Sequence, residues 1–265
     1  MSEKRKTYPS DLSDGEWAQI EALIPAVKPG GRPARYARRE VVNAILYVLR
    51  TGGSWRMLPH DFPPWETVYG YFRRWCQAGV WHQLHAQLRT TWRTETGRDP
   101  CPSAGALDSQ SVKTTEKGGG KGWDGHKHVN GRKRHLLVDS QGLVLGVHIT
   151  SAAVRDEHGG AYLLRKVRAS YPRLEVLWVD GGYEGLFRAY AWHIQGLEVQ
   201  MSIQQKARAY AVTSKRWVVE RTFAWLGRYR RLSKDYEYLC QTSENWIYVA
   251  MSHLLVRRLA RMRAF

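Results

Sequence analysis

The sequence predicts an α/β protein in which a small all-helical unit precedes a domain built on one mixed β-sheet. Three observations lead to this prediction. Apolar residues recur at helical spacing up to residue 97, and short apolar runs bounded by turn residues follow residue 102. A chain of 265 residues that is 43% hydrophobic is also long enough to bury a real core. We expect the boundary between residues 98 and 99, giving domains 1–98 and 99–265.

The helical unit is expected to begin at Ser13, because Ser13 and Glu16 have the S-x-x-E spacing of a capping box. Apolar periodicity predicts four helices, over about residues 13–24, 41–51, 65–78 and 80–97. The connector TGGSWRMLPHDFP joins the second helix to the third, and such a pair is typical of a helix-turn-helix relative. A plain packing or dimerisation bundle is the alternative.

Arginines of this unit are candidate DNA contacts. The connector VKPGGRPARYARRE is rich in Pro, Gly and Arg, and is either a solvated loop or an arm that touches DNA. The third helix carries two arginines on the side opposite its apolar residues. The residues predicted to bind DNA in this unit are Arg35, Arg38, Arg73 and Arg74.

After residue 102 the pattern predicts strands as well as helices. The first strands are expected at residues 104–107 and in a hairpin over 134–150 that turns at 140–142, and later strands at 175–179 and 197–203. Helices are expected over about residues 158–169, 184–195, 214–229 and 243–262. This is the element order of a ribonuclease-H-like domain, in which three antiparallel strands are followed by two parallel strands added through helical crossovers.

The formal net charge of +17 predicts a polyanionic partner, and nucleic acid is the usual one. A membrane surface is the weaker alternative, because the chain has no lipidation motif and no run of about 18 apolar residues. Residues 1–17 lack the apolar core of a secretory signal. The three separated cysteines, Cys76, Cys101 and Cys240, fit a reducing cytoplasm.

Two aspartates are placed where apolar strands are expected to end. Asp108 follows the strand at 104–107, and Asp180 follows the strand at 175–179 and precedes two glycines. In the predicted strand order these two strands are neighbours, so their carboxylates would lie close enough to share a cation. Two like charges held that close are costly unless a metal or a proton compensates them. Because Mg²⁺ prefers oxygen ligands, the pair predicts a magnesium site.

The third carboxylate is Glu220, beside the apolar face of the helix predicted at 214–229. Arg216 and Arg221 on the same helix would offer positive charge to a phosphate backbone. Taken singly, the aspartates are turn or cap residues and Glu220 is the partner of Arg216 in a helical ion pair. Taken together in so basic a chain, the three acids predict two metal ions that support in-line phosphoryl transfer.

Other acidic residues receive structural interpretations. Asp156 and Glu157 are expected to cap the following helix, because acidic residues favour helix N-termini. Asp139 is expected to be structural in the hairpin turn, and Asp124 to be solvated in the loop at 111–132.

That loop and the residues after it are rich in basic side chains, which we expect to contact phosphates. A flexible charged loop is the alternative. The pair formed by His126 and His128 lacks further ligands nearby and does not predict a metal site. The residues predicted to bind DNA here are Lys113, Lys121, Lys127, Arg132, Lys133 and Arg134.

Three separated stretches of the second part resemble transposases of the insertion-sequence-four and insertion-sequence-five superfamily, the latter group especially. They are ALDSQSVK, VDGGYEG and VVERTFAWLGRYRRLSKDYE. LSDGEWAQIEALIP and GRPARYARREVVNAILYVLRTGGSWRMLP of the first part match as well, so the resemblance covers roughly residues 8–260. It implies a ribonuclease-H-like fold with an Asp-Asp-Glu triad, which falls on Asp108, Asp180 and Glu220. It also implies Mg²⁺ or Mn²⁺ as the cofactor, two ions per active site.

One motif departs from the superfamily pattern, in which a Tyr and an Arg precede the Glu and a Lys follows it. Arg216 and Glu220 match, but Thr213 stands at the Tyr place and Gly227 at the Lys place. Arg228 is the candidate substitute and is predicted, with Arg216 and Arg221, to bind DNA. The handling of the DNA end is therefore the step at which this chain is expected to differ.

The resemblance implies a bacterial, cytoplasmic and nucleoid-associated DNA transposase. Its partners would be double-stranded DNA, as terminal inverted repeats and target, and further copies of the chain in a homodimer or larger synaptic complex. Two alternatives stay open: a ribonuclease-H-like nuclease that cuts without joining, and a non-catalytic DNA-binding regulator.

Overall fold

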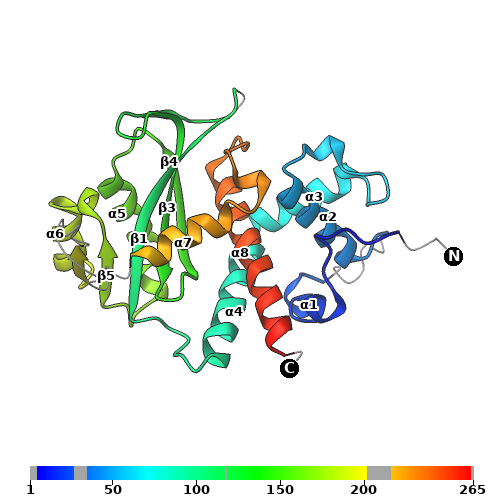
Figure 1. Ribbon diagram of the computed structural model, residues 1–265, viewed down its shortest axis with the longest axis horizontal. Coiled ribbons are helices and arrows are strands. Elements are labelled where there is room, and N and C mark those ends of the chain that lie inside the picture. The colour runs from blue at the N-terminus through cyan, green and yellow to red at the C-terminus, as the bar shows by residue number, and fades with distance from the viewer. Residues whose placement is uncertain (1–4, 27–34, 117, 202–215, 264–265) are drawn as a thin grey trace, which may run out of the picture.

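The computed structural model describes residues 5–26, 35–116, 118–201 and 216–263. Figure 1 shows a sheet flanked by helices at one end of the molecule and the N-terminal helices at the other. The helices α4 (Val80–Glu95) and α8 (Cys240–Met262) lie side by side between these two ends. Within the described ranges, no helix has both the length and the apolar character needed to cross a membrane.

The N-terminal end is all-helical, as the sequence predicts. It contains α1 (Asp14–Ala18), η1 (Glu21–Leu23), α2 (Arg38–Thr51), η2 (Trp55–Met57), α3 (Trp65–Gln77) and α4, where η denotes a short 3-10 helix. The capping box is confirmed, because the Glu16 N–H donates to the Ser13 hydroxyl at 3.2 Å and the Ser13 N–H donates to the Glu16 carboxylate at 3.0 Å. The first helix is shorter than predicted, since the chain leaves α-helical geometry after Ala18 and resumes as η1.

One mixed sheet forms the second part of the chain. Its strands are β1 (Ala104–Lys113), β2 (Gly122–Asp124), β3 (Val129–Asp139), β4 (Val144–Ser151), β5 (Val176–Val179) and β6 (Glu198–Met201). Strand β3 pairs antiparallel with β1, β2 and β4, whereas β5 pairs parallel with both β1 and β6. The predicted three antiparallel and two parallel strands are therefore present. The short β2 is an addition that the sequence did not predict.

Side chains alternate along β1, so successive residues face opposite layers. Leu107 faces a core shared with α5 (Asp156–Val167) and α6 (Leu186–His193). Ala106 faces a larger core shared with α7 (Trp217–Leu226), α8 and the N-terminal helices. This alternation decides which helix each functional side chain of β1 meets.

The larger core is continuous from the N-terminal helices to the sheet. Helix α8 packs on both α4 and β4, and Trp246 of α8 stacks on Phe72 of α3 with 4.4 Å between the ring centroids. Both of these aromatic rings are buried, so each contributes a large apolar area to the core. The predicted domain boundary falls in the connection between α4 and β1 and stays a prediction, because the two parts share this core.

Candidate active site

Asp108 lies in the middle of β1, so the prediction that it ends a strand is wrong. The strand continues because β3 pairs with it as far as Lys113, opposite Gly131. It is the neighbouring strand β5 that stops, at Val179. Ala106 pairs with Trp178, and two further residues along each chain bring Asp108 level with Asp180. The two aspartates therefore meet beside the carboxyl end of β5, as the neighbouring strands predicted.

Asp180 uses one carboxylate oxygen for the turn after β5. Its Oδ1 accepts a hydrogen bond from the Gly182 N–H at 3.0 Å and so caps the short η4 helix, Gly181–Tyr183. The other oxygen, Oδ2, points away from the turn toward Arg216. The turn fixes this carboxylate while leaving one of its oxygens available.

Arg216 contacts all three acids of the predicted triad. Its Nη1 lies 3.4 Å from Oδ2 of Asp108 and 3.4 Å from Oδ2 of Asp180, and its Nη2 lies 2.7 Å from Oε1 of Glu220. These carboxylates come from β1, the turn after β5 and the first turn of α7. One guanidinium thus brings together three residues that are far apart in the sequence. Their catalytic role stays a prediction.

The three acids differ in how deeply they are buried. The side chain of Asp108 is 14% exposed, that of Asp180 is 37% exposed and that of Glu220 is 53% exposed. Burial is the main cause that raises the pKa of Asp108, to about 6, and the nearby charge of Asp180 raises it further. The Ser109 N–H, at 2.7 Å from Oδ1, and Arg216 act in the opposite direction. Asp108 is therefore the carboxyl whose ionisation most needs a positive partner.

A second group of charged side chains lies on the other side of β1, under α5. The Ser109 hydroxyl donates to Oδ1 of Asp156 at 2.6 Å, and Lys133 Nζ lies 3.0 Å from Asp156 and 3.4 Å from Asp124. Burial tends to raise the pKa of Asp156, but the Ser109 hydrogen bond and Lys133 outweigh it and lower that pKa. We call Asp124, Lys133 and Asp156 the α5-side cluster.

This cluster corrects two expectations about acidic residues. Asp124 is 6% exposed, so it is not solvated, and it accepts hydrogen bonds from the Ser111 hydroxyl and two backbone N–H groups. Asp156 stands in the first turn of α5 but does not cap it, because the N-cap residue is Arg155 and no side chain caps this helix. Asp139 is structural, as expected, and is buried in an ion pair with Arg93.

Tyr183 is a buried residue near the acids that sequence reasoning missed. Its side chain is fully buried, and its hydroxyl has no hydrogen-bond partner among the described residues. Its pKa is raised well above the ordinary range, first by burial and then by the charges of Asp108, Asp156 and Asp180. Tyr183 is thus close enough to acids of both groups to feel their charges, and its ring packs on Phe187.

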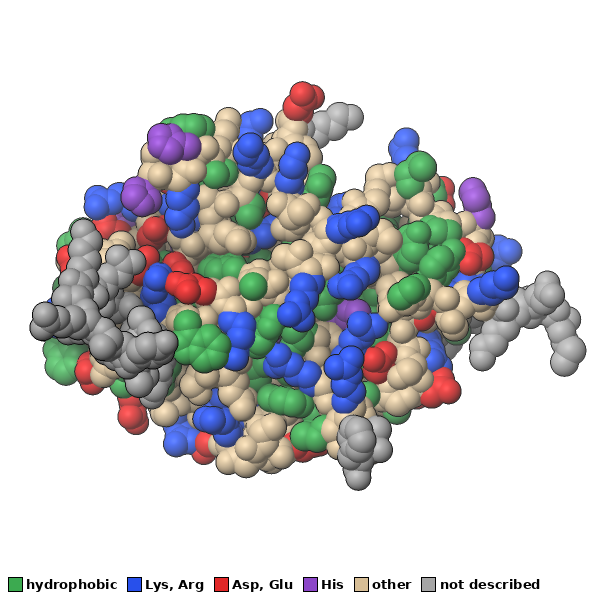
Figure 2. All heavy atoms as spheres, viewed as in Figure 1, with side chains coloured by type: hydrophobic (Ala, Val, Ile, Leu, Met, Phe, Trp, Pro, Cys, Tyr) green, Lys and Arg blue, Asp and Glu red, His purple; other side chains and the backbone are tan. Residues whose placement is uncertain are grey.

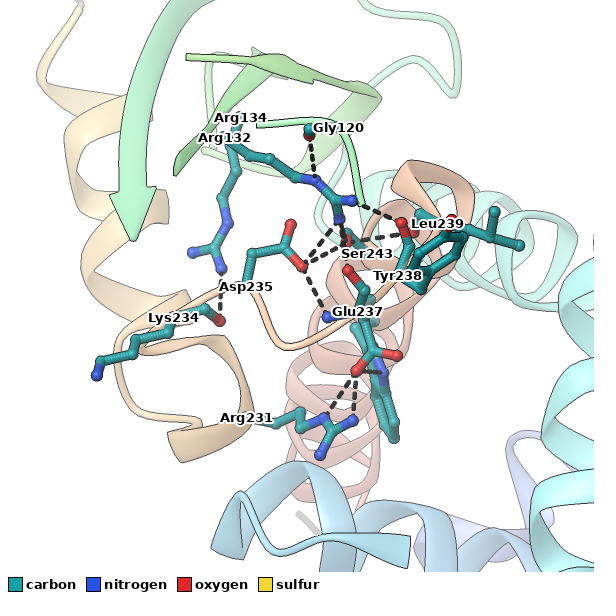
Figure 3. A network of polar contacts seen from close by, with 11 residues as sticks. Gly120, Arg132, Arg134, Arg231, Lys234, Asp235, Glu237, Tyr238, Leu239 and Ser243 are labelled. Carbon is teal, nitrogen blue, oxygen red and sulfur yellow. Dashed lines mark hydrogen bonds and ion pairs between the residues drawn. The ribbon is translucent and has the colours of Figure 1, made fainter. Parts of the chain in front are cut away.

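The structure contradicts the prediction that Arg132, Lys133 and Arg134 contact DNA, because all three are buried. Arg132 is 0% exposed and donates to the Tyr238 carbonyl at 2.6 Å, the Glu237 carbonyl at 2.8 Å and Asp235 at 3.2 Å. Figure 3 shows Arg132 and Arg134 reaching from the strand toward residues 231–239. Their guanidinium groups join the sheet to the segment before α8.

Arg134, two residues further along β3, is buried as well and is not available to DNA. Its Nη1 donates to the Leu232 carbonyl at 2.9 Å, and burial lowers its pKa to about 10. The run of basic residues indicates an exposed loop from sequence alone. In the structure these residues belong to β3, which begins at Val129. A strand alternates its side chains between two faces, and this strand has both faces covered.

The other predicted DNA contacts remain at the surface. Lys127 is exposed, and its Nζ donates to the Ser109 carbonyl at 3.0 Å, beside the acids. Arg38 and Arg216 are half-buried. The remaining exposed or partly exposed members of the predicted set are Arg35, Arg73, Arg74, Lys113, Lys121, Arg221 and Arg228.

Arginines also gather on α2, α7, α8 and the turn after α7, and two of them, Arg50 and Arg258, were missed by sequence reasoning. Arg221 stacks on Trp217 and Trp225 at 4.4 and 4.8 Å, and Arg258 also stacks on Trp225, at 4.4 Å. Arg50 donates to the Arg228 carbonyl at 3.0 Å. No carboxylate pairs with Arg50, Arg221, Arg228 or Arg258 within the part of the chain that the structure describes. We call these four residues the arginine surface.

Figure 2 shows basic side chains spread across the middle of this face, over α7 and α8. Burial is the first cause that lowers the pKa of Arg258, and the charges of Arg221 and Arg228 lower it further. Two of these arginines, Arg221 and Arg258, lie on tryptophan rings, and an arginine without an acidic partner suits an anionic ligand.

Comparisons with known proteins cover both parts of the chain. Residues 12–85 match the model of a family described as "Putative transposase of IS4/5 family", and residues 99–255 match that of the "Transposase DDE domain". An uncharacterized 16.2 kDa protein of insertion element IS402 from Burkholderia cepacia is 34% identical over 113 residues, which is 40% of this chain and 76% of that protein.

Two further relatives match over shorter shares of their length. The "Putative transposase for insertion sequence element IS402" of Burkholderia cepacia is 31% identical over 117 residues, 40% of this chain and 54% of that protein. The uncharacterized protein y4sN of Sinorhizobium fredii is 32% identical over 77 residues, 29% of this chain and 62% of that protein.

Proposed function

Because this chain belongs to the DDE-domain transposases of the insertion-sequence-four/five type, we propose that it binds the terminal inverted repeats of its own insertion sequence and cuts and joins DNA there. The observation that carries the proposal is the convergence of three carboxylates, from β1, the turn after β5 and α7, on one guanidinium. The fold that goes with it is ribonuclease-H-like, with β1 between β3 and β5 in the sheet.

The three acids fit the divalent metal that the family implies. One cationic nitrogen lies 3.4 Å from an oxygen of both Asp108 and Asp180, so these oxygens already face a point that holds positive charge. All the side chains offered are carboxylates, which suit Mg²⁺ or Mn²⁺. No three acidic, histidine or cysteine side chains of the described residues are close enough to hold a metal as they stand. The ligands would therefore close in from their present positions.

Each carboxylate has a distinct part in such a site. Asp108 is the most deeply held, with Oδ1 fixed by the Ser109 N–H, and Asp180 is fixed by its turn. Glu220 is the most exposed of the three and has the greatest freedom to move toward DNA. When bound there, two metal ions activate the attacking oxygen and stabilise the leaving oxygen of an in-line displacement.

The DNA path is proposed to run from Glu220 along α7 over the arginine surface. Arg221 follows Glu220 directly and shares Trp225 with Arg258, while Arg50 contacts the Arg228 carbonyl. Side chains of this kind contact phosphates and position DNA without reading its sequence. In the helical part, Arg73 and Arg74 are exposed on α3 and are proposed, with Arg35 and Arg38, to contact the repeat. A homodimer or larger synaptic complex is proposed, because two element ends must be held together.

The test is an assay of the products made from DNA that carries the repeats flanking the gene. Purified protein with Mg²⁺ is expected to give both cut ends and joined molecules, and Asp180→Asn is expected to give neither. Asp99→Asn, which changes an exposed aspartate outside the site, serves as the matched control and should behave as wild type. Cut ends without joined molecules would indicate a nuclease. Binding without either product, in Mg²⁺ and in Mn²⁺, would indicate a regulator.

A further inference from the structure

We propose that Arg216 is the triad's own counter-ion, which divalent cations displace when they bind. The proposal rests on the proposed function for the identity of the metal ligands. It adds that the three acids are gathered around a protein cation and that loading the metal site releases a guanidinium on the DNA-facing helix. Nothing in the triad motif itself requires this, since an Arg four residues before a Glu is an ordinary helical pair.

The contacts of Arg216 go beyond that ordinary pair. Nη2 makes the helical contact with Glu220 at 2.7 Å, while Nη1 reaches two aspartates of other elements at 3.4 Å each. The side chain is 21% exposed, so it lies within the group of acids and not over it. If Arg216 only stabilised α7, its contact with Glu220 would suffice and the contacts with the two aspartates would not be needed.

Charge balance implies that either the Arg216 guanidinium or the metal ions neutralise the acids. Asp108 is buried beside Asp180, and two like charges in such a place need a compensating cation. Lys127 also lies near, but its Nζ contacts the Ser109 backbone carbonyl and hydroxyl and not the aspartate oxygens. Arg216 is thus the positive group that touches all three acids. Because Mg²⁺ requires direct oxygen ligands, it must take oxygens that Arg216 now faces.

The released guanidinium would have a place to go. Arg216 is the N-cap residue of α7, directly before Trp217 and five residues before Arg221. Those two residues stack on each other at 4.4 Å at the edge of the arginine surface. Cation binding would thereby add one positive side chain to the face that holds DNA, so cation and DNA binding would strengthen each other.

The direct test is the affinity of the DNA-free protein for Mn²⁺, measured by isothermal titration calorimetry. We expect Arg216→Gln to bind Mn²⁺ more tightly than wild type, on the order of tenfold, because the competing charge is gone. Arg216→Lys, which keeps a charge but cannot span three acids, should lie between the two. The matched control is Arg221→Gln on the same helix, which should bind as wild type. Circular dichroism and gel filtration check that each variant is folded.

Equal or weaker Mn²⁺ affinity in both Arg216 variants would overturn the proposal. A second readout is the midpoint of thermal unfolding: without Mn²⁺ it should fall in Arg216→Gln, and Mn²⁺ should raise it further there than in wild type. Failure of the proposed function would look different. In that case Asp180→Asn would leave Mn²⁺ affinity unchanged, whether Arg216 is present or replaced.

Discussion

The two sides of β1 carry carboxylates in contrasting surroundings. On the α7 side, Asp108, Asp180 and Glu220 share one arginine through contacts of 2.7 to 3.4 Å, and two of the three are substantially exposed. On the α5 side, Asp124 and Asp156 are fixed to Lys133 and to hydroxyls of the strand. The α5-side cluster has one cation for two acids, whereas the triad has one cation for three. The acids of the α5-side cluster hold the fold through fixed partners, whereas the acids of the triad share one cation and are more open to ligands.

The largest expected difference between the two sides is in catalysis. Asp108→Asn and Glu220→Gln should each lower strand transfer by about a thousandfold or more, because the metal ligands act as a unit, while the protein stays folded. Asp124→Asn should lower activity only as far as it lowers the folded fraction. Strand-transfer rates normalised to folded protein separate the two. Equal losses for acids on both sides of β1 would mean that the α7 side is not the catalytic one.

The next effect concerns stability on the α5 side. Lys133→Met should destabilise the protein by about 3–5 kcal/mol, because it leaves the buried Asp124 and the half-buried Asp156 without their cation. Urea denaturation measures this, with Lys113→Met as the exposed control. A loss of less than 1 kcal/mol, on the scale of surface pairs at about 0–1 kcal/mol, would mean that the cluster is not structural.

How much of this contrast the sequence predicts depends on the kind of residue. Local sequence pattern predicts which strands are neighbours, the turn after Asp180 and the helix that carries Glu220. The sequence alone is therefore enough to propose the triad. Asp156 is different, because its partner Ser109 is brought to it by the alternation of β1 and the packing of α5. Nothing in the local sequence gives that register.

The basic residues show a different limit. A net charge of +17 makes every lysine and arginine a candidate for DNA, and the run at 132–134 stands out by its charge. The structure buries that run because β3 is longer than predicted and both its faces are covered. By contrast, Arg50 and Arg258 stand outside any run assigned to DNA, although they flank α7. The segment at 197–203 and the helix expected to start at 214 extend partly outside the described residues.

A smaller effect is expected from pH. The folded-state pKa of Asp108 is raised from 3.8 to about 6, so folding favours its protonated form. The stability from this group is present below about pH 4 and is lost as the pH rises through 6, a change of about 2–3 kcal/mol. Wild type should therefore lose free energy of unfolding relative to Asp108→Asn between about pH 4 and 7.5 in a chelator. Parallel pH curves for the two proteins would show that Asp108 is not held as described.

The smallest expected effect is on DNA affinity, which should depend on arginines of the α7 side of the sheet and not on those of the α5 side. Arg258→Gln should weaken binding about equally for all sequences and reduce the slope of log affinity against log salt by roughly one, since one phosphate contact is lost. Arg165→Gln, on α5 across the sheet, is the matched control and should leave the slope unchanged. Fluorescence anisotropy over a salt series measures both. A larger slope change in the control would place the DNA on the wrong face.

The most direct test asks which side of β1 receives the cations. Crystals of the protein with its repeat DNA and Mn²⁺ would give anomalous difference peaks at the metal positions. The expected result is density between Asp108, Asp180 and Glu220, with Arg216 turned away from the aspartates. Peaks only beside Asp124 and Asp156, or none within reach of Asp108, would contradict the assignment of the catalytic centre to the α7 side.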